Sequence, residues 1–221
     1  MGQQRAHGLD EKQARRTLFL DAAGQLFDES GFAAVAMTAV AERAGLAKGT
    51  LYLYFDTKES LFLGVLEREY TGFFEALDAK LSGEDAPRKP KKMAQYLASE
   101  LVARPRFTQL LALLHGVLEQ NIGEERARGF KKSLIDNTTR TGALLEARLR
   151  DLPVGGGVRA LQQLQALVIG LQAIAHPAAV VAKVLAEPGF APLRVDFERE
   201  LSSLWPPVLA ALCDTDDRET A

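Results

Sequence analysis

This 221-residue chain contains one cysteine, three histidines and one tryptophan, and these shortages exclude several kinds of protein. The single cysteine, Cys213, rules out an internal disulfide framework and indicates a reducing, cytoplasmic environment. With so few thiol and imidazole groups, no metal site is expected. No apolar run approaches the ~20 residues of a membrane span, and residues 1–16 lack the apolar segment of a secretory signal, so no membrane association is expected.

An excess of charge of one sign is also missing. The chain has 27 Lys and Arg against 29 Asp and Glu, a formal net charge of −2. This balance argues against a nucleic-acid binder that relies on overall positive charge. The sequence has no recognisable serine–histidine–carboxylate arrangement, phosphate-binding loop or metal-ligand cluster, so we expect neither an enzyme nor a cofactor.

The abundant residues predict an all-α protein. Ala, Leu, Glu, Arg, Lys and Gln dominate, the first proline is Pro87, and no segment alternates apolar and polar residues as a strand would. We expect a first helix from a cap near Asp10 to Gly31, a second after its cap Thr38, a third over about 48–55 and a fourth capped by Thr57. Further helices are expected at about 91–103, 106–122, 124–150, 158–175, 177–186 and 195–212.

Residues 38–55 have the pattern of a helix-turn-helix. Two short helices are separated by a turn at Gly45, a residue type suited to left-handed backbone. Apolar anchors for the domain core follow at Val40, Leu46, Leu51 and Phe55. This arrangement would hold the second helix so that it fits the major groove of DNA.

The stretch from Phe19 to Glu67 resembles the DNA-binding domain of the TetR (tetracycline repressor) family. The matching segments are A-A-x-x-L-F followed by G-F, then A-G-L-x-K-G-T-L-Y-x-Y-F, and T-K-E-x-L-F at the start of the fourth helix. The resemblance implies a homodimeric, sequence-specific transcriptional regulator, most often a repressor, that a small-molecule effector releases from a double-stranded DNA operator. The alternative is a ligand-independent or architectural DNA-binding protein.

The resemblance also implies which residues face DNA: Thr38, Lys48, Gly49, Thr50, Tyr52, Tyr54 and Lys58. Leu53 holds a variable position suited to a thymine methyl contact. The alternatives stay open at three of these positions, because the two tyrosines could cover the domain core and Lys58 could be a simple surface cation. Arg15, Arg16 and Arg43 are expected to join Lys48 and Lys58 on the DNA side.

The predicted domains are a helix-turn-helix domain at 10–57, a connecting helix at 58–81, and a larger helical ligand-binding and dimerisation domain at 91–213. A linker at 82–90 carries prolines and charges between them. His115 and Glu119 lie four residues apart in an apolar helix, so they could line a ligand pocket or form a structural hydrogen bond. Asn121 and Asn137 are further ligand candidates.

Two apolar stripes with helical spacing predict the dimer interface. We expect them to meet in a four-helix bundle across a two-fold axis, although each stripe could instead face its own domain. The stripes comprise Leu161, Leu164, Val168, Leu171 and Ile174 in one helix, and Leu201, Leu204, Trp205, Val208 and Leu212 in the other.

Overall fold

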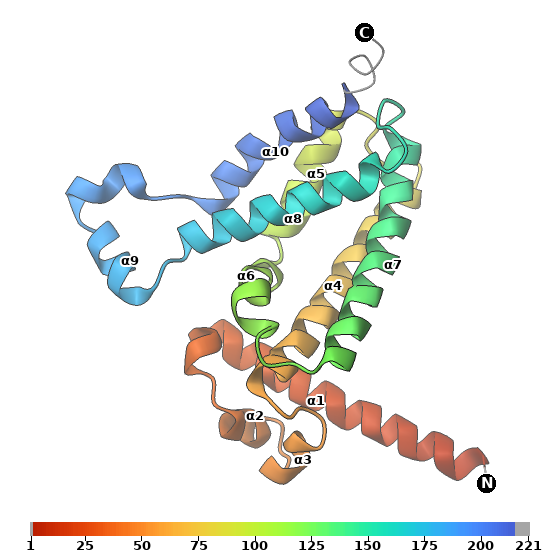
Figure 1. The fold of residues 1–221 in the computed structure, drawn as a ribbon, viewed down its shortest axis with the longest axis vertical. Coiled ribbons are helices and arrows are strands. Elements are labelled where there is room, and N and C mark those ends of the chain that lie inside the picture. The colour runs from red at the N-terminus through yellow and green to blue at the C-terminus, as the bar shows by residue number, and fades with distance from the viewer. Residues whose placement is uncertain (1, 215–221) are drawn as a thin grey trace. The chain divides into compact units, whose positions relative to one another are not determined.

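The computed structural model describes residues 2–214, which form helices and no strand (Figure 1). The predicted all-α fold is confirmed. The chain divides into two compact units, Met1–Glu69 with Leu114–Ala127, and Tyr70–Leu113 with Arg128–Ala221. We refer to these as unit 1 and unit 2.

Unit 1 begins with α1 (Gly2–Ala34), followed by α2 (Met37–Arg43) and α3 (Lys48–Tyr52). Helix α1 starts well before Asp10, so the predicted start and cap at that residue are wrong. The preceding Gln, Arg and Ala residues are good helix formers, which is why the helix extends to them. Gly31, with φ of 73°, interrupts the helix where a break is predicted.

The turn between α2 and α3 confirms the predicted role of Gly45, whose φ is 68°. Its N–H donates to the carbonyl of Glu42 at 3.1 Å, and the N–H of Leu46 donates to the carbonyl of Ala41 at 3.0 Å. These two bonds close the end of α2 in the manner of a Schellman motif. The predicted cap Thr38 is wrong, because the residue before α2 is the extended Ala36 and no side chain caps the helix.

Helix α4 (Lys58–Ser82) begins in unit 1 and continues into unit 2. Thr57 caps it as predicted, because its Oγ1 accepts the N–H of Ser60 at 3.0 Å. The first half of α4 supplies the centre of the unit 1 core, where the ring of Phe62 contacts Phe27 and Phe32 at centroid distances of 5.8 and 5.2 Å.

The segment Leu114–Ala127 belongs to unit 1 although it follows a helix of unit 2. The predicted helix 106–122 ends early, and a π-helical turn, η1 (Leu114–Leu118), replaces its second half. The carbonyl of Asn121 accepts from Thr57 Oγ1 at 3.2 Å, and Arg126 forms two hydrogen bonds of 2.6 Å with the Glu67 carboxylate. These contacts tie the segment to the first turns of α4.

Unit 2 contains α5 (Pro90–Val102), α6 (Pro105–Leu113), most of α7 (Glu124–Arg148), α8 (Gly156–Ala175) and α10 (Phe197–Cys213). Helix α8 packs against α6 and α10, and α10 packs against α5 (Figure 1). Asp78 on α4 accepts from both Arg140 and Thr141 on α7, each at 2.5 Å. Helices α7 and α8 meet at Gly142 and Gly157, whose backbones lie too close for a side chain between them.

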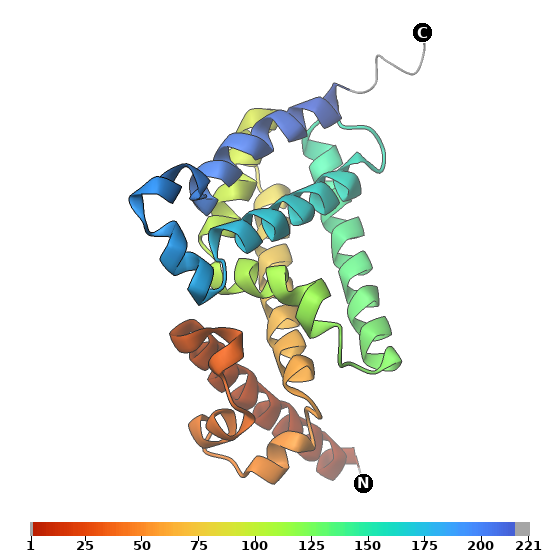
Figure 2. The same cartoon turned by 60° about the vertical axis from the view of Figure 1, so that its left-hand side comes forward.

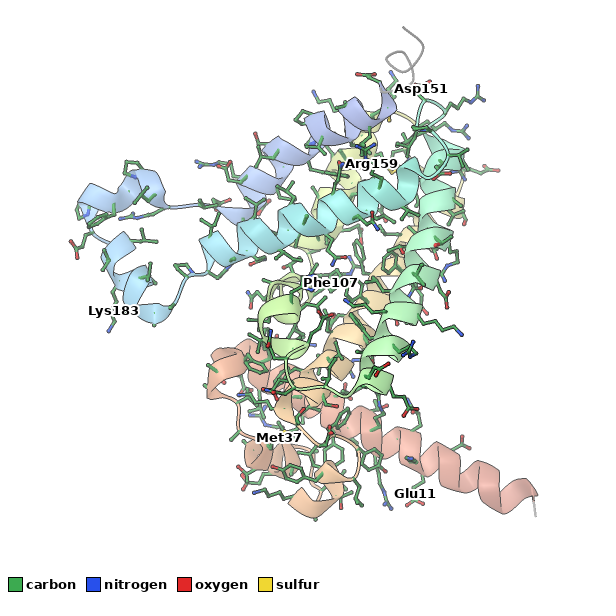
Figure 3. All side chains as sticks on the ribbon, viewed as in Figure 1. Glu11, Met37, Phe107, Asp151, Arg159 and Lys183 are labelled. Atoms are coloured by element: carbon green, nitrogen blue, oxygen red, sulfur yellow. The ribbon has the colours of Figure 1, made fainter. Side chains whose placement is uncertain are left out.

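The segment between α8 and α10 carries α9 (Ala179–Leu185) and the short 3₁₀ helix η2 (Pro188–Leu193), and we call residues 177–195 the arm. Figures 1 and 2 show the arm projecting from the other helices of unit 2, and Figure 3 marks Lys183 on it. The Arg194 guanidinium holds it together by donating to the carbonyls of Leu185, Ala186 and Glu187. Neither α9 nor η2 contains a buried residue.

Within residues 2–214, no single helix is both long and apolar enough to cross a membrane. Helices α8 and α9 would pass that test together by length and composition, but they are bent by 73° relative to each other.

Candidate DNA-binding surface and C-terminal cavity

Helix α3 is held by two anchors and presents its remaining side chains outward. Leu51 and Phe55 are buried in the core of unit 1, as predicted. On the opposite side, Leu53 is 82% exposed and Tyr52 is 44% exposed. The helix is therefore fixed by one face and open on the other.

The polar side chains of this surface lie together on α3 and its neighbours. The Lys48 ammonium lies 5.9 Å from the centroid of the Tyr52 ring. Thr50 is half-buried, and Thr38 is exposed in the first turn of α2. Gly49 is exposed, and a Cβ added there would meet no atom within 4 Å. Lys48, Gly49, Thr50 and Tyr52 thus share one short helix, as the sequence pattern predicts.

Tyr54 and Lys58 are more closely tied to the protein than the other candidates. The half-buried Tyr54 ring contacts Phe19 at a centroid distance of 5.7 Å, so part of it covers the core. The Lys58 ammonium donates to the carbonyl of Ala33 at 3.2 Å and lies 4.4 Å above the Phe32 ring. Burial lowers the pKa of Lys58, and the nearby Glu59 carboxylate opposes this effect. Lys58 therefore already fastens α4 to the end of α1.

The arginines expected on the DNA side are paired with carboxylates. Arg43 forms a bidentate pair with Glu29 at 2.8 and 2.9 Å, and this hydrogen bonding lowers the pKa of the Glu29 carboxyl. Arg15 pairs with Glu11 one turn away. Arg16 lies 3.8 Å from Glu67, and burial lowers the pKa of its guanidinium.

The predicted ligand residues lie outside the apolar interior of unit 2. His115 is exposed and its Nδ1 lies 3.0 Å from Glu119 Oε2, which is the structural pairing left open above. Asn121 is in unit 1, where its amide donates to Glu59 at 3.3 Å. Asn137 accepts from Arg140 on the next turn of α7 at 2.7 Å.

Aromatic side chains line a small cavity inside unit 2. Its volume is about 30 Å³, which accommodates one or two water molecules. Polar groups enter the lining at Thr138 and Gln165. The rings come from Tyr70, Phe73 and Phe74 on α4 and from Phe107 on α6. Figure 3 labels Phe107. The spacing of the aromatic residues on α4 was the one feature of the sequence that could have predicted this cavity. The same spacing is typical of an ordinary core helix.

Most of the residues predicted for the dimer interface are buried inside unit 2. They pack within one copy of the chain, where α8 meets α6 and α10 and where α10 meets α5, which is the alternative left open for each stripe. Val208 is half-buried, and Ile174 and Leu204 of the same stripes are exposed. The buried members are Leu161, Leu164, Val168, Leu171, Leu201, Trp205 and Leu212.

Most exposed large apolar side chains of unit 2 lie in the arm or on the helices that flank it. Of the twelve large apolar side chains exposed in the described part of the chain, seven fall between residues 174 and 204. They occupy the arm, the last turn of α8 and the middle of α10: Ile174, Val180, Val181, Val184, Phe190, Leu193 and Leu204. Ile174 and Leu204 share the helical spacing of the stripes, so burial, and not periodicity, separates them from the internal members.

No group of three or more His, Cys, Asp or Glu within the described residues could hold a metal ion. Cys213 is buried, and burial raises the pKa of its thiol.

Two family models match consecutive parts of the chain. One, described as "Bacterial regulatory proteins, tetR family", matches residues 19–65, which include α2 and α3. The other, described as "Tetracyclin repressor-like, C-terminal domain", matches residues 67–207. Together they cover most of the chain.

Curated and solved relatives agree with these matches. The HTH-type transcriptional repressor KstR of Rhodococcus jostii is 41% identical over 91 residues, 41% of this chain and 40% of KstR. The chain thus spans less than two thirds of the curated relatives' length. A TetR/AcrR-family regulator from Thermobifida fusca has the same fold (TM-score 0.56, 21% identity, 93% of this chain and 100% of that one). So does Bacillus subtilis FadR in complex with stearoyl-CoA (TM-score 0.51, 20% identity, 90% and 97%).

Proposed function

Because this chain belongs to the TetR family, and is therefore a DNA-binding transcriptional regulator, we propose that it is a homodimeric repressor released from its operator by a small, largely apolar ligand. The observation that carries the proposal is the outward face of α3. Leu51 and Phe55 fix the helix, while Tyr52 and Leu53 are exposed. A helix held in this way suits insertion into the major groove.

In the proposed complex, the contacts of α3 divide by chemistry. Lys48 and Thr50 contact phosphate oxygens or base edges, and Gly49 lets the backbone approach a phosphate closely. Tyr52 contributes a flat ring with a polar tip, and Leu53 contacts a thymine methyl group. Thr38 in α2 and Tyr54 beside α3 add phosphate contacts.

Lys58 has a positioning role in this proposal. Its ammonium already donates to the Ala33 carbonyl and lies over the Phe32 ring. The ammonium can contact a DNA phosphate only through an N–H bond that it does not donate to Ala33. Its larger contribution is to fix α4 against the end of α1.

A second copy of the chain is proposed to cover the arm and the adjoining helix ends. The arm has internal hydrogen bonds but no buried side chain, and its exposed valines continue toward Ile174 on α8 and Leu204 on α10. A local concentration of exposed large apolar side chains is typical of an interaction surface. In a two-fold dimer, two α3 helices would enter successive major grooves about 34–36 Å apart.

The aromatic cavity of unit 2 is the proposed effector site. Four aromatic rings favour an apolar ligand portion, and Thr138 and Gln165 supply polar contacts. The FadR relative binds stearoyl-CoA, a molecule with a long acyl chain, which supports an effector with an extended apolar part. The first half of α4 belongs to unit 1, and α6 leads directly into the unit 1 segment Leu114–Ala127, so opening the cavity can shift residues of the unit 1 core.

One observation favours a second candidate, a DNA-binding protein that needs no ligand. The cavity volume of about 30 Å³ is far below the ~300–1,000 Å³ of a typical ligand pocket. Under the main proposal, the ligand must open the site by displacing aromatic rings. Under the second, the rings are simply a filled core.

Operator binding is the direct test. Gel-shift titration on the DNA flanking the gene should detect binding, and Lys48→Ala or Tyr52→Ala should each weaken it by about 1–3 kcal/mol per half-site. Lys92→Ala, at an exposed lysine on α5, is the matched control and should bind as the wild type does. Unchanged binding in both α3 variants would contradict the assignment.

The same titration distinguishes the two candidate functions. Acyl-CoA thioesters of increasing chain length are added to the protein–DNA complex. The main proposal is supported if a thioester releases the DNA and if Phe107→Trp, which fills the cavity, weakens that release. DNA affinity that no thioester changes, with wild-type and variant alike, supports the ligand-independent binder.

A further inference from the structure

Unit 2 contains a groove between the arm and the end of α8 that the proposed function does not use. Its volume is about 430 Å³, within the ~300–1,000 Å³ of typical ligand pockets and far above that of the aromatic cavity. It lies where α8 and α9 are bent by 73° relative to each other, a bend that Figure 1 shows. The lining residues used below are Ile174 and Ala175 in α8, Ala182, Leu185 and Ala186 in α9 and at its end, and Arg194 after η2.

Helix α9 presents one face to this groove and another away from it. Ala182, Leu185 and Ala186 are three and four residues apart, so they share a face of the helix, and all three line the groove. Val180 and Val184 are four residues apart on a different face, and neither lines the groove. The groove and the exposed valines proposed to meet a second copy therefore occupy different sides of α9.

The face of α9 that lines the groove lacks the packing that a short helix needs. The helix has seven residues and no buried side chain. Helices of this length are marginal in water, and most of their stability in proteins comes from packing an apolar face. The side chains of Ala182 and Ala186 are too small to fill the space, and Ile174 across the groove is 55% exposed. An apolar molecule in the groove would supply the missing contacts.

Arg194 gives the groove a single positive charge that no carboxylate of the protein neutralises. Its Nε donates to the carbonyl of Leu185, and its Nη2 donates to the carbonyls of Ala186 and Glu187 at 2.7 and 3.0 Å. Within residues 2–214, Nη1 donates to no acceptor and the guanidinium forms no ion pair. The side chain is exposed, so a ligand can reach it. Two N–H bonds of the guanidinium thus remain for an acceptor from outside the chain.

The lining of the groove indicates which acceptor. Seven of its eight residues are apolar, and Arg194 is the eighth. The carboxylates nearest to Arg194 in the sequence, Glu187 and Asp196, are not among them. One free cationic donor group matches one negative charge, and the apolar walls match a hydrocarbon chain. Together they favour an organic anion with a carboxylate at one end.

We propose that this groove binds a monocarboxylate with an apolar tail. The carboxylate accepts from Arg194 Nη1, and the tail lies between Ile174 on α8 and the face of α9 that carries Ala182 and Leu185. The site shares no residue with the aromatic cavity. The proposal depends neither on operator binding nor on the effector proposed above.

Calorimetric titration of the full chain with octanoate, 1-octanol and octylammonium tests the chemistry of the ligand, because the three share one tail and differ in the charge of the head group. Octanoate should bind roughly three- to tenfold more tightly than octanol, since it adds one charge-assisted hydrogen bond at an exposed guanidinium. Octylammonium should bind more weakly than either. Absent octanoate binding, equal affinity for octanoate and octanol, or a preference for the ammonium would each overturn the proposal.

Two substitutions locate the bound octanoate. Ala182→Phe places a ring in the groove and should reduce the affinity by about tenfold or more, because the tail loses its apolar contacts. Ala173→Phe, at an exposed position of α8 that does not line the groove, is the matched control and should bind as the wild type does. Phe107→Trp, in the aromatic cavity, should also leave octanoate binding unchanged. Wild-type affinity in Ala182→Phe, or a loss in Phe107→Trp, would place the ligand elsewhere and overturn the proposal.

A third substitution tests the role of the guanidinium. Arg194→Gln keeps a donor for the carbonyls at the end of α9 but removes the charge, so the preference for octanoate over octanol should disappear. Lys183→Gln makes the same change of charge on α9 outside the groove and should keep the preference. A preference that survives in Arg194→Gln would overturn the proposal. If Arg194→Gln binds neither molecule, Arg194→Lys, which retains the charge, must restore the preference; failure to do so would also overturn it.

Discussion

Replacing Gly49 by alanine gives a stringent test of the DNA-binding surface, because the change is harmless to the free protein. Gly49 is the second residue of α3, and a Cβ added there meets no atom within 4 Å. Its φ is not among the positive values found in the described chain, at Gly31, Gly45 and Gly155. Alanine in a helix is more stable than glycine by roughly 0.5–1 kcal/mol, so the Tm should rise by about 1–4 °C.

The expected effect on DNA binding has the opposite sign. If the backbone at Gly49 approaches a phosphate closely, the added methyl group keeps the two apart and weakens a hydrogen bond to a charged oxygen. Such a bond contributes about 1.5–3 kcal/mol, which corresponds to a loss of roughly 10- to 150-fold in affinity per half-site. A gain in stability combined with a loss of affinity is difficult to explain in any other way.

Gly72→Ala is the matched control for this experiment. Gly72 is exposed on α4, and a Cβ there also meets no atom within 4 Å. Both variants are measured by thermal denaturation and by fluorescence anisotropy on the operator fragment. Gly72→Ala should gain stability and keep full affinity. Full affinity in Gly49→Ala would refute the close approach, and a fall in its Tm would refute the open space found beside α3.

Two further predictions concern unit 2. Gly157→Ala should lower the free energy of unfolding, measured by urea denaturation, by about 1–3 kcal/mol or more. The new Cβ would lie 2.1 Å from the Gly142 carbonyl oxygen, so α7 and α8 would have to separate. A stability equal to that of the wild type would contradict this close contact between the two helices. Val184→Asp, on the exposed face of α9, should shift the sedimentation of the protein from dimer to monomer, whereas Val154→Asp, at a 99% exposed loop position, should not. A dimer that survives Val184→Asp would show that the arm lies outside the interface.

Features set by neighbouring residues were predictable from the sequence. The N–H groups of Gly45 and Leu46 close α2 through bonds to carbonyls three and five positions earlier, and Thr57 caps α4 through a residue three positions later. Leu51 and Phe55 follow the same local periodicity. Such features depend on one turn of backbone at a time, so residue type and spacing are sufficient to find them.

Features that depend on which surfaces meet were not predictable. The stripe containing Leu164 and Val168 has the same spacing whether it faces α6 or a second copy, and only burial shows that it is internal. His115 and Glu119 have the spacing of an interacting pair and do interact, but on an exposed π-helical turn rather than in a pocket.

In unit 1, the near-neutral charge of the chain corresponds to ion pairs between cations and carboxylates. Of the five cations expected on the DNA side, Arg15, Arg16 and Arg43 are paired with carboxylates and Lys58 with a backbone carbonyl; Lys48 lies over the Tyr52 ring. Cations already paired within the protein release few counterions from DNA, since each paired carboxylate offsets the positive charge that would neutralise a phosphate. Under the proposed function, operator affinity therefore depends on the fit of α3 into the groove and on the spacing of two copies. Correct half-site geometry is then a condition for binding, and a small ligand-induced change in that geometry would release the DNA.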